Sequence, residues 1–353
     1  MRIKIKNKRR FFLSICIILG VLFLIFNGNR LLNKSTVSNI KEAEGNKSIK
    51  EKDDKGNQIS ISQDGTIYFD ETKYFKRYTI KLVDKEEYKG YKEDADCIYL
   101  DLNNVDKHKL SSDSFKEQDK NIFLSKNDGT TKLALKKDFS KNNFVFLNQL
   151  TNDLLVLISK QESPYSHTVV IDPGHGGADP GTHAYDNSFL EKDVTLKIAL
   201  EIRSELIFNG KDVVMTRDNE LEPDVYFQQP ERVAITNESK RDAFVSVHVN
   251  SYELSNVYNG VETHYSFKNM YMKESEILAQ KVQEKILTCD NWNDRKLKLN
   301  DLHVIDNAQM PAVLIECGFA SNPDDVRRLN DNQALNNLAK NISAGIIAYL
   351  DDK

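Results

Sequence analysis

The first sign of an α/β fold is Val169-Val170-Ile171-Asp172-Pro173-Gly174-His175-Gly176-Gly177, a short apolar run that ends in a turn rich in proline and glycine. His175 sits at the mouth of that turn. Open α/β sheets usually build their sites at such strand ends. Gly174, Gly176 and Gly177 would let the backbone turn sharply and leave space beside His175 for a bulky ligand.

Two further apolar runs end in a side chain that can handle metals or protons. Val245-Ser246-Val247-His248 ends in a histidine, and Ala312-Val313-Leu314-Ile315-Glu316 ends in a glutamate. Glu191 opens a helix-like segment. Two histidines and a carboxylate, with a fourth position left open, make a recurrent catalytic zinc set. We therefore take His175, Glu191 and His248 as candidate Zn²⁺ ligands that folding must bring together.

Each candidate has a structural alternative. Glu191 is followed by Lys192-Asp193, so it could be a first-turn acid favoured by the helix dipole. His248 could be a hydrogen-bonded histidine at a strand end. Glu316 ends a run that is otherwise almost entirely apolar. Burying a carboxylate there costs free energy unless the group is ion-paired or has a catalytic role. As a general base, Glu316 would take a proton from the attacking water and pass it to the leaving amine.

The pattern after Ser163-Pro164 predicts an α/β domain over residues 165–353, with a mixed, mostly parallel sheet and helices on both faces. The helix expected over residues 191–209 carries an apolar stripe, with Gly210 as its stop. The other helices are expected at residues 273–288 and 333–350. Strands are expected at residues 168–172, 212–216, 243–249, 260–266, 301–305 and 312–317.

Residues 63–161 have a different sequence pattern from that of the α/β domain. Seven short β-type runs separated by polar turns predict a small all-β sandwich. The only histidine in this part is His108, in a charged loop, and we find no catalytic pattern. A binding or spacer module is the simpler interpretation.

The N-terminus has the pattern of a membrane-targeting segment. Residues 2–10 are strongly basic, and residues 11–26 are almost wholly apolar and uncharged. No Ala-x-Ala cleavage site follows, so residues 1–30 are expected to be an uncleaved membrane anchor rather than a removed signal segment. The positive-inside rule then puts the rest of the chain outside the cell membrane; cleavage would make it a secreted protein. Residues 31–62 are polar and predict a flexible linker.

Composition excludes other classes of function. The chain has 353 residues, a length that suits two domains plus extra segments. Its net charge of −4, without interleaved basic and aromatic residues, gives no reason to expect nucleic-acid binding. The four cysteines show no CxxC spacing, which argues against a thiolate zinc site or a disulfide framework.

Residues 167–352 resemble the zinc-dependent N-acetylmuramoyl-L-alanine amidases of the Amidase_3 family. The matching blocks come in family order and cover the domain. They are Ile171–Gly177 with Asp179-Pro180-Gly181, Glu191-Lys192, Val214–Arg217, Glu231–Ala234 with Asn237, Phe244–Asn250, Gly260–Thr263, and Pro311–Phe319 with Ser321-Asn322.

The resemblance implies an extracytoplasmic, membrane-anchored hydrolase that remodels the cell wall. Its substrate would be peptidoglycan, and the bond cut would join the lactyl group of muramic acid to L-alanine. By resemblance His175, Glu191 and His248 are zinc ligands and Glu316 is the catalytic glutamate. The candidate substrate-binding residues are Asn250, Arg232, Gly176 and Gly177, although a salt bridge is an equal alternative for Arg232.

Residues 182–189 depart from the family pattern, which often has more glycine there, and this affects only the rim of the cleft. The long inserted segment that blocks some relatives is missing between His248 and the helix at 273–288. Autoinhibition of that kind is therefore not expected, while an activating protein remains a candidate partner. Residues 63–161 faintly resemble AMIN domains in strand pattern. A binding protein with little activity, or a zinc hydrolase acting on another wall bond, is the rival interpretation.

Overall fold

The computed structural model describes residues 59–60, 67–82, 84–103, 121–127, 130–238, 241–289 and 291–353. The predicted anchor at residues 1–30 lies outside this part, as does the linker except for its end. There, Ile59–Ser60 form strand β1, which pairs with β2 and so belongs to a sheet rather than to the linker. None of the helices in the described part is long and apolar enough to cross a membrane.

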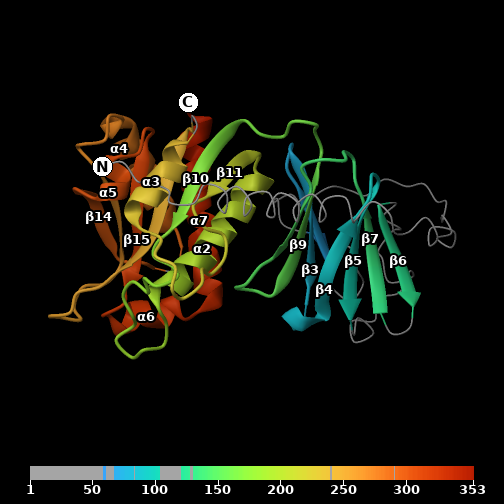
Figure 1. Ribbon diagram of the computed structural model, residues 1–353, viewed down its shortest axis with the longest axis horizontal. Helices are drawn as coiled ribbons and strands as arrows, with labels where there is room; N and C mark the ends of the chain where they lie inside the picture. Colours follow the sequence, from blue (N-terminus) through green and yellow to red (C-terminus); the bar gives the residue numbers. More distant parts are fainter. Residues whose placement is uncertain are drawn as a thin grey trace, which may run out of the picture. The chain divides into compact units, whose positions relative to one another are not determined.

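The C-terminal domain is built on a six-stranded sheet with the order β11-β10-β12-β15-β13-β14 (Figure 1). Strands β11, β10, β12 and β15 run parallel, β13 is antiparallel to β15, and β14 is parallel to β13. The predicted mixed, mostly parallel sheet is confirmed. The strands are β10 (His167–Pro173), β11 (Lys211–Met215), β12 (Ala243–Asn250), β13 (Val261–Tyr265), β14 (Asp294–Leu299) and β15 (Ala312–Phe319).

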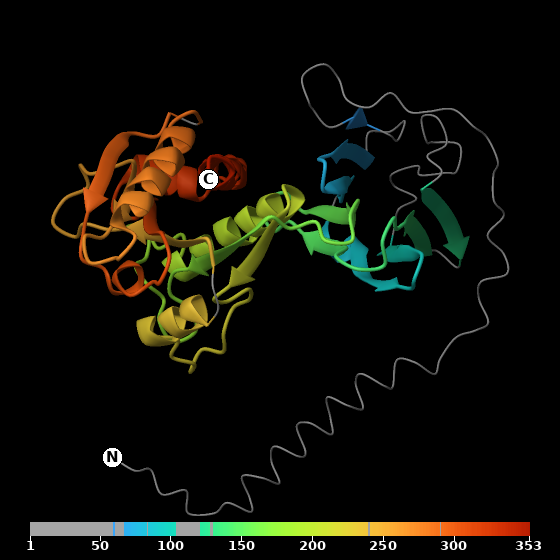
Figure 2. The same cartoon turned by 90° about the horizontal axis from the view of Figure 1, so that it is seen from above.

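Helices cover both faces of this sheet (Figure 2). One face carries α2 (Glu191–Phe208), α4 (Met272–Ile286) and α7 (Asn332–Asp351); the other carries α3 (Gln229–Asn237) and α5 (His303–Asp306). Side chains alternate along each strand. Val245 and Val247 therefore pack with α2 in the larger core, whereas Phe244 and Leu314 pack with α5. Helix α6 (Pro323–Leu329) follows β15.

The prediction of a strand at residues 301–305 was wrong, because Asp301 and Leu302 precede helix α5, which begins at His303. Leu302 N–H donates to Asp306 Oδ1. This bond closes a helical turn over a segment whose sequence pattern resembles that of a strand. The strand lies just before it, at β14. Sequence reasoning missed β14 because four of its six residues are charged, as is common for an edge strand. Helices α3 and α6 were also not predicted.

The described part of residues 59–159 forms two antiparallel sheets, ordered β1-β2-β3-β9-β8 and β4-β5-β7-β6. They share one apolar core, in which Tyr78 and Ile80 of one sheet join Ile98 and Leu100 of the other. The all-β prediction is confirmed; β1 and β4 were missed. The strands are β2 (Ile67–Glu71), β3 (Phe75–Lys81), β4 (Tyr88–Glu93), β5 (Cys97–Asn103), β6 (Ile122–Asn127), β7 (Thr130–Lys136), β8 (Phe144–Leu147) and β9 (Asp153–Ser159).

This β module contacts the C-terminal turns of α2. Phe75 and Leu157 share an apolar cluster with Ile207 and Phe208 of the helix. Arg77 is buried with them: its Nη1 donates to Glu205 at 2.7 Å, and its guanidinium lies 3.9 Å from the centre of the Phe208 ring. The contact therefore combines aromatic packing with a buried ion pair.

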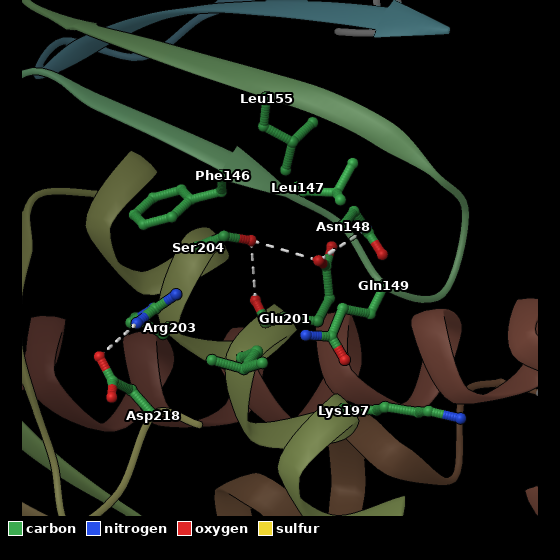
Figure 3. A pocket seen from close by; sticks show the side chains of 11 residues that line it. Phe146, Leu147, Asn148, Gln149, Leu155, Lys197, Glu201, Arg203, Ser204 and Asp218 are labelled. Atoms are coloured by element: carbon green, nitrogen blue, oxygen red, sulfur yellow. Dashed lines mark hydrogen bonds and ion pairs between the residues drawn. The ribbon is translucent and has the colours of Figure 1, made fainter. Parts of the chain in front are cut away.

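A second buried acid lies at this contact, beside a cavity of about 120 Å³ (Figure 3). Asn148, in the β8–β9 turn, donates its side-chain amide to Glu201 Oε2 at 2.7 Å, and Ser204 Oγ lies 3.3 Å from the same oxygen. Burial raises the pKa of Glu201 to about 7; the charge of Glu205 adds to the rise, while Lys340 and Arg77 oppose it.

This shift predicts that Glu201 makes folding less favourable as the pH rises. The folded pKa lies above the usual 4.5, so the unfolded chain loses this proton first. Between pH 4.5 and 7 the stability falls by about 3 kcal/mol and then levels off. We expect Glu201→Gln to be more stable than the wild type at pH 8 and equal to it near pH 4.5. Urea unfolding at both pH values measures the difference. A constant offset would contradict the assignment.

Candidate active site

The three candidate metal ligands converge at the carboxyl ends of the central strands. His175 follows β10, Glu191 is the first residue of α2, and His248 lies near the end of β12. Glu191 Oε1 is 3.2 Å from His175 Nε2 and 3.0 Å from His248 Nδ1. One ligand atom from each residue fits within 4.8 Å of the others. The fold thus assembles residues that are far apart in the sequence.

Two glycines make this convergence sterically feasible. Gly181 has φ +64°, and a Cβ there would lie 2.5 Å from Glu191 Oε2 and 2.6 Å from His175 Cδ2. A Cβ at Gly174 would lie 2.5 Å from His248 Cε1. His175 itself has φ 60°, a strained conformation for a residue with a side chain. The site is packed so tightly that its neighbours must be glycine.

Hydrogen bonds fix the Glu191 carboxylate. Its Oε1 accepts from Val249 N–H and its Oε2 from Thr182 N–H, both at 2.9 Å. The expectation that residues 182–189 affect only the rim of the cleft was therefore wrong at Thr182, whose backbone contacts a candidate ligand. Burial opposes ionisation, but His175 and His248 hold the pKa of Glu191 far below its usual value. Glu191 is therefore an anion within reach of both imidazoles.

Asp179 supports His175 from the other side, and sequence reasoning gave it no role. Its Oδ2 is 2.8 Å from His175 Nδ1, which leaves Nε2 facing Glu191. Burial opposes protonation of His175, but Glu191 and Asp179 raise its pKa. The signal was present in the sequence: an acid four residues after the histidine, held in a turn by the Pro180-Gly181 pair.

Glu316 lies directly beside the three ligands. It pairs in register with His248 across β12 and β15, so both side chains lie on the same face of the sheet. Burial, followed by the charges of Glu191 and Glu262, raises the pKa of Glu316 well above its usual value. Its Oε2 is buried and has no hydrogen-bond partner among the described residues. Cys317, the next residue along β15, packs in the core on the opposite face.

A cleft of about 700 Å³ opens over this cluster. His175, His248 and Glu316 line it together with the segment before α3 and the start of α5, which includes the exposed His303. Most of the cleft wall is apolar, whereas the side chains that can react lie at its base.

Arg232, predicted to bind substrate, is only 4% exposed and is engaged by the protein. Its Nη1 donates to Asp172 Oδ1 and to Pro173 O, both at 2.7 Å, and its Nη2 donates to His175 O at 2.5 Å. Burial opposes the ionisation of Asp172, but Arg232, Thr216 and Ser246 hold its pKa below its usual value. Arg232 thus fixes the turn that carries His175.

The other three substrate-binding candidates also contact mainly the protein. Asn250 Nδ2 donates to Glu262 Oε1 at 2.9 Å, and Asn250 Oδ1 accepts from Ser251 N–H. Gly176 and Gly177 are buried; a Cβ at Gly176 would meet Arg217, and one at Gly177 would meet Val225 O. Their direct contact with substrate, like that of Arg232, stays a prediction.

Residues 169–348 match the family model Amidase_3, described as N-acetylmuramoyl-L-alanine amidase. The chain belongs to the Amidase_3 family. This membership makes it an enzyme of the N-acetylmuramoyl-L-alanine amidase class. The matched range begins inside β10, continues through the other five strands of the sheet and contains all three candidate metal ligands.

Individual Amidase_3 relatives align with the same half of the chain. An uncharacterized protein, YqiI of Bacillus subtilis, is 36% identical over 185 residues, 52% of this chain and 85% of the relative. The germination-specific N-acetylmuramoyl-L-alanine amidase of the same organism is 31% identical, covering 52% and 80%. The crystal structure of an N-acetylmuramoyl-L-alanine amidase from Clostridium difficile 630 aligns with TM-score 0.50 and 35% identity, covering 53% and 98%.

We predict that Arg232→Met destabilises the amidase by about 3–5 kcal/mol, because it leaves the Asp172 carboxylate buried without its counter-ion. Urea unfolding at pH 7 measures the loss. The double variant Asp172→Asn with Arg232→Met removes both charges and should recover part of that stability. A single variant within 1 kcal/mol of the wild type would show that this ion pair does not hold the turn.

Proposed function

We propose that this amidase uses Zn²⁺ to hydrolyse the amide between the lactyl group of N-acetylmuramic acid and L-alanine in peptidoglycan. The observation that carries the proposal is the meeting of His175, Glu191 and His248 beside the partnerless oxygen of Glu316. Two imidazoles and a carboxylate are the donor set of many catalytic zinc sites, with a fourth position left for water or substrate.

The hydrogen bonds indicate which atoms would hold the ion. His175 Nδ1 faces Asp179, so its Nε2 is the ligand atom; His248 presents Nδ1, and Glu191 its carboxylate. A carboxylate behind a ligating histidine orients the ring and raises its basicity. When bound, zinc polarises the scissile carbonyl and lowers the pKa of an attacking water.

Glu316 is suited to move the proton. In amide hydrolysis a carbon–oxygen bond forms, the carbon–nitrogen bond breaks, and a proton must pass from the water to the leaving nitrogen. Glu316 accepts this proton on its carboxylate and donates it to the amine of L-alanine. Its place on the ligand-bearing face of the sheet, in register with His248, puts it within the cleft.

The proposed place of action follows from the N-terminus. A basic segment before an apolar run of membrane-anchor character would leave the catalytic domain outside the cell membrane, where peptidoglycan lies. The β module, which resembles AMIN domains in strand pattern, would be a wall-binding or spacer part. An activating protein remains a candidate partner.

Activity on purified peptidoglycan tests the proposal directly. We expect the full chain, kept in detergent with Zn²⁺, to release free stem peptides with a new L-alanine amine and to leave the glycan unmodified. Glu316→Gln should lose about 10²- to 10⁴-fold in rate, because this is the usual contribution of proton transfer and the amide cannot replace it. Mass spectrometry identifies the products, and elemental analysis counts the zinc.

Three other results would contradict the proposal. A zinc-loaded wild type that releases nothing would point to a binding protein or to a missing activator. Products cut at another bond would assign a different wall hydrolase. Equal activity of Glu316→Gln and wild type would remove Glu316 from the mechanism.

We also predict that Asp179→Asn weakens zinc binding by about 10- to 100-fold, because the amide orients and polarises His175 less well than the carboxylate does. Competition with a fluorescent chelator measures the affinity. Asp186→Asn is the matched control: Asp186 is an exposed acid of the same loop that contacts Ser188 and not the cluster. Equal zinc affinity in the two variants would show that Asp179 does not support zinc binding.

A further inference from the structure

Arg295, on the edge strand β14, is held in a fixed position by three side chains. Its Nε donates to Glu262 Oε2 at 2.9 Å. Its guanidinium lies 4.7 Å from the centre of the Phe319 ring and 5.1 Å from that of Tyr258. A guanidinium that is paired through Nε and stacked on aromatic rings loses little further freedom when it binds a ligand.

The two terminal nitrogens of Arg295 have no partner among the residues that the structure describes, and the side chain is 26% exposed. Arg232 shows the contrast: its side chain is 5% exposed and both terminal nitrogens donate to the protein. An arginine that is needed only for folding uses its donors as Arg232 does. Arg295 instead keeps the fork that binds carboxylates with two parallel hydrogen bonds.

Glu262 links Arg295 to the reacting end of the sheet. It lies directly opposite Glu316 across β13 and β15, so both side chains lie on the same face. Glu262 has two more partners: Asn250 Nδ2 at 2.9 Å and His264 Nε2 at 3.2 Å. Glu262 therefore keeps these two contacts when the guanidinium of Arg295 turns its free edge toward a ligand.

The spacing fits a peptide that leaves the site. Strand β14 lies two strands from β15, about 10 Å at the usual spacing. An extended chain advances about 3.3 Å per residue, so Arg295 is about three residues from the scissile amide. The cleft of about 700 Å³, which is lined by the segment before α3 and by the start of α5, has room for the sugar.

We propose that Arg295 forms a subsite for a carboxylate of the stem peptide, on the leaving side of the scissile amide. The inference rests on the proposed function. Peptidoglycan stem peptides carry free carboxylates, and the fork of Arg295 is the group in this region of the sheet that matches them. Arg295 is thus a specificity residue, and the proton chemistry stays with Glu316.

Steady-state kinetics on two synthetic muramoyl peptides tests the subsite. One peptide has free carboxylates, and in the other all of them are amidated. We expect Arg295→Gln to raise KM for the free acid by about 10- to 100-fold, the worth of a charged hydrogen bond, with kcat within about threefold. KM for the amidated peptide should not change. Arg295→Lys keeps the charge that faces Glu262 but loses the fork, so its KM should be intermediate.

Lys296→Gln is the matched control, because it removes one positive charge from the adjacent residue, which pairs with Asp294 instead of Glu262. It should leave both KM values unchanged. Thermal unfolding and zinc content, measured on each variant, separate a binding defect from a folding defect. Equal effects of Arg295→Gln on the two peptides, or none on the free acid, would overturn the subsite.

Calorimetric titration with the free stem peptide separates this inference from the proposed reaction. The peptide is a product, so its binding needs no turnover. Weaker binding to Arg295→Gln supports the subsite even if the wild type cleaves nothing, an outcome in which only the reaction fails. Binding that is equal in wild type and Arg295→Gln overturns the subsite whether or not the amide is cleaved.

Discussion

The buried pair of Asp172 and Arg232 is the constraint on which the active site depends. An ionised carboxylate with no solvent exposure is tolerated only because the guanidinium and two hydroxyl groups surround it. The same guanidinium binds the carbonyls of Pro173 and His175, so the charge that stabilises the end of β10 also sets the path of the following turn. The strained backbone of His175 persists because these contacts leave it no alternative.

Because side chains alternate along a strand, the two faces of each central strand have different roles. On β12 and β15 one set of side chains builds the core with α2, α4 and α7, while the other set supplies His248 and Glu316. The apolar core and the reactive cluster therefore share a backbone, and neither can shift in register without the other. Because a slip by one residue would exchange the two faces, the hydrophobic pattern that specifies the fold also specifies which residues meet at the candidate metal site.

The sequence was sufficient for the elements with strong periodicity. The apolar stripe of α2 and the buried runs of β10, β12 and β15 predicted the sheet and brought the four reactive residues to one edge. It was insufficient where local pattern and tertiary context disagree: the alternating residues 301–305 lead into α5, and the charged β14 gains its partner only across the sheet. The ties of Arg232 and Asn250 to buried carboxylates, and the support of His175 by Asp179, depend on distances that no linear spacing reveals.

Helix α2 has a metal-ligand candidate as its first residue and the contact with the β module in its last turns. At 1.5 Å per residue its 18 residues span about 27 Å. Phe75 and Arg77 cover an apolar and charged patch that a chain cut near residue 161 would expose to water. The β module is thus more than an independent, exchangeable domain. A chimaera that replaced it with another wall-binding module would have to supply a new cover for Phe208 and a new counter-ion for Glu205.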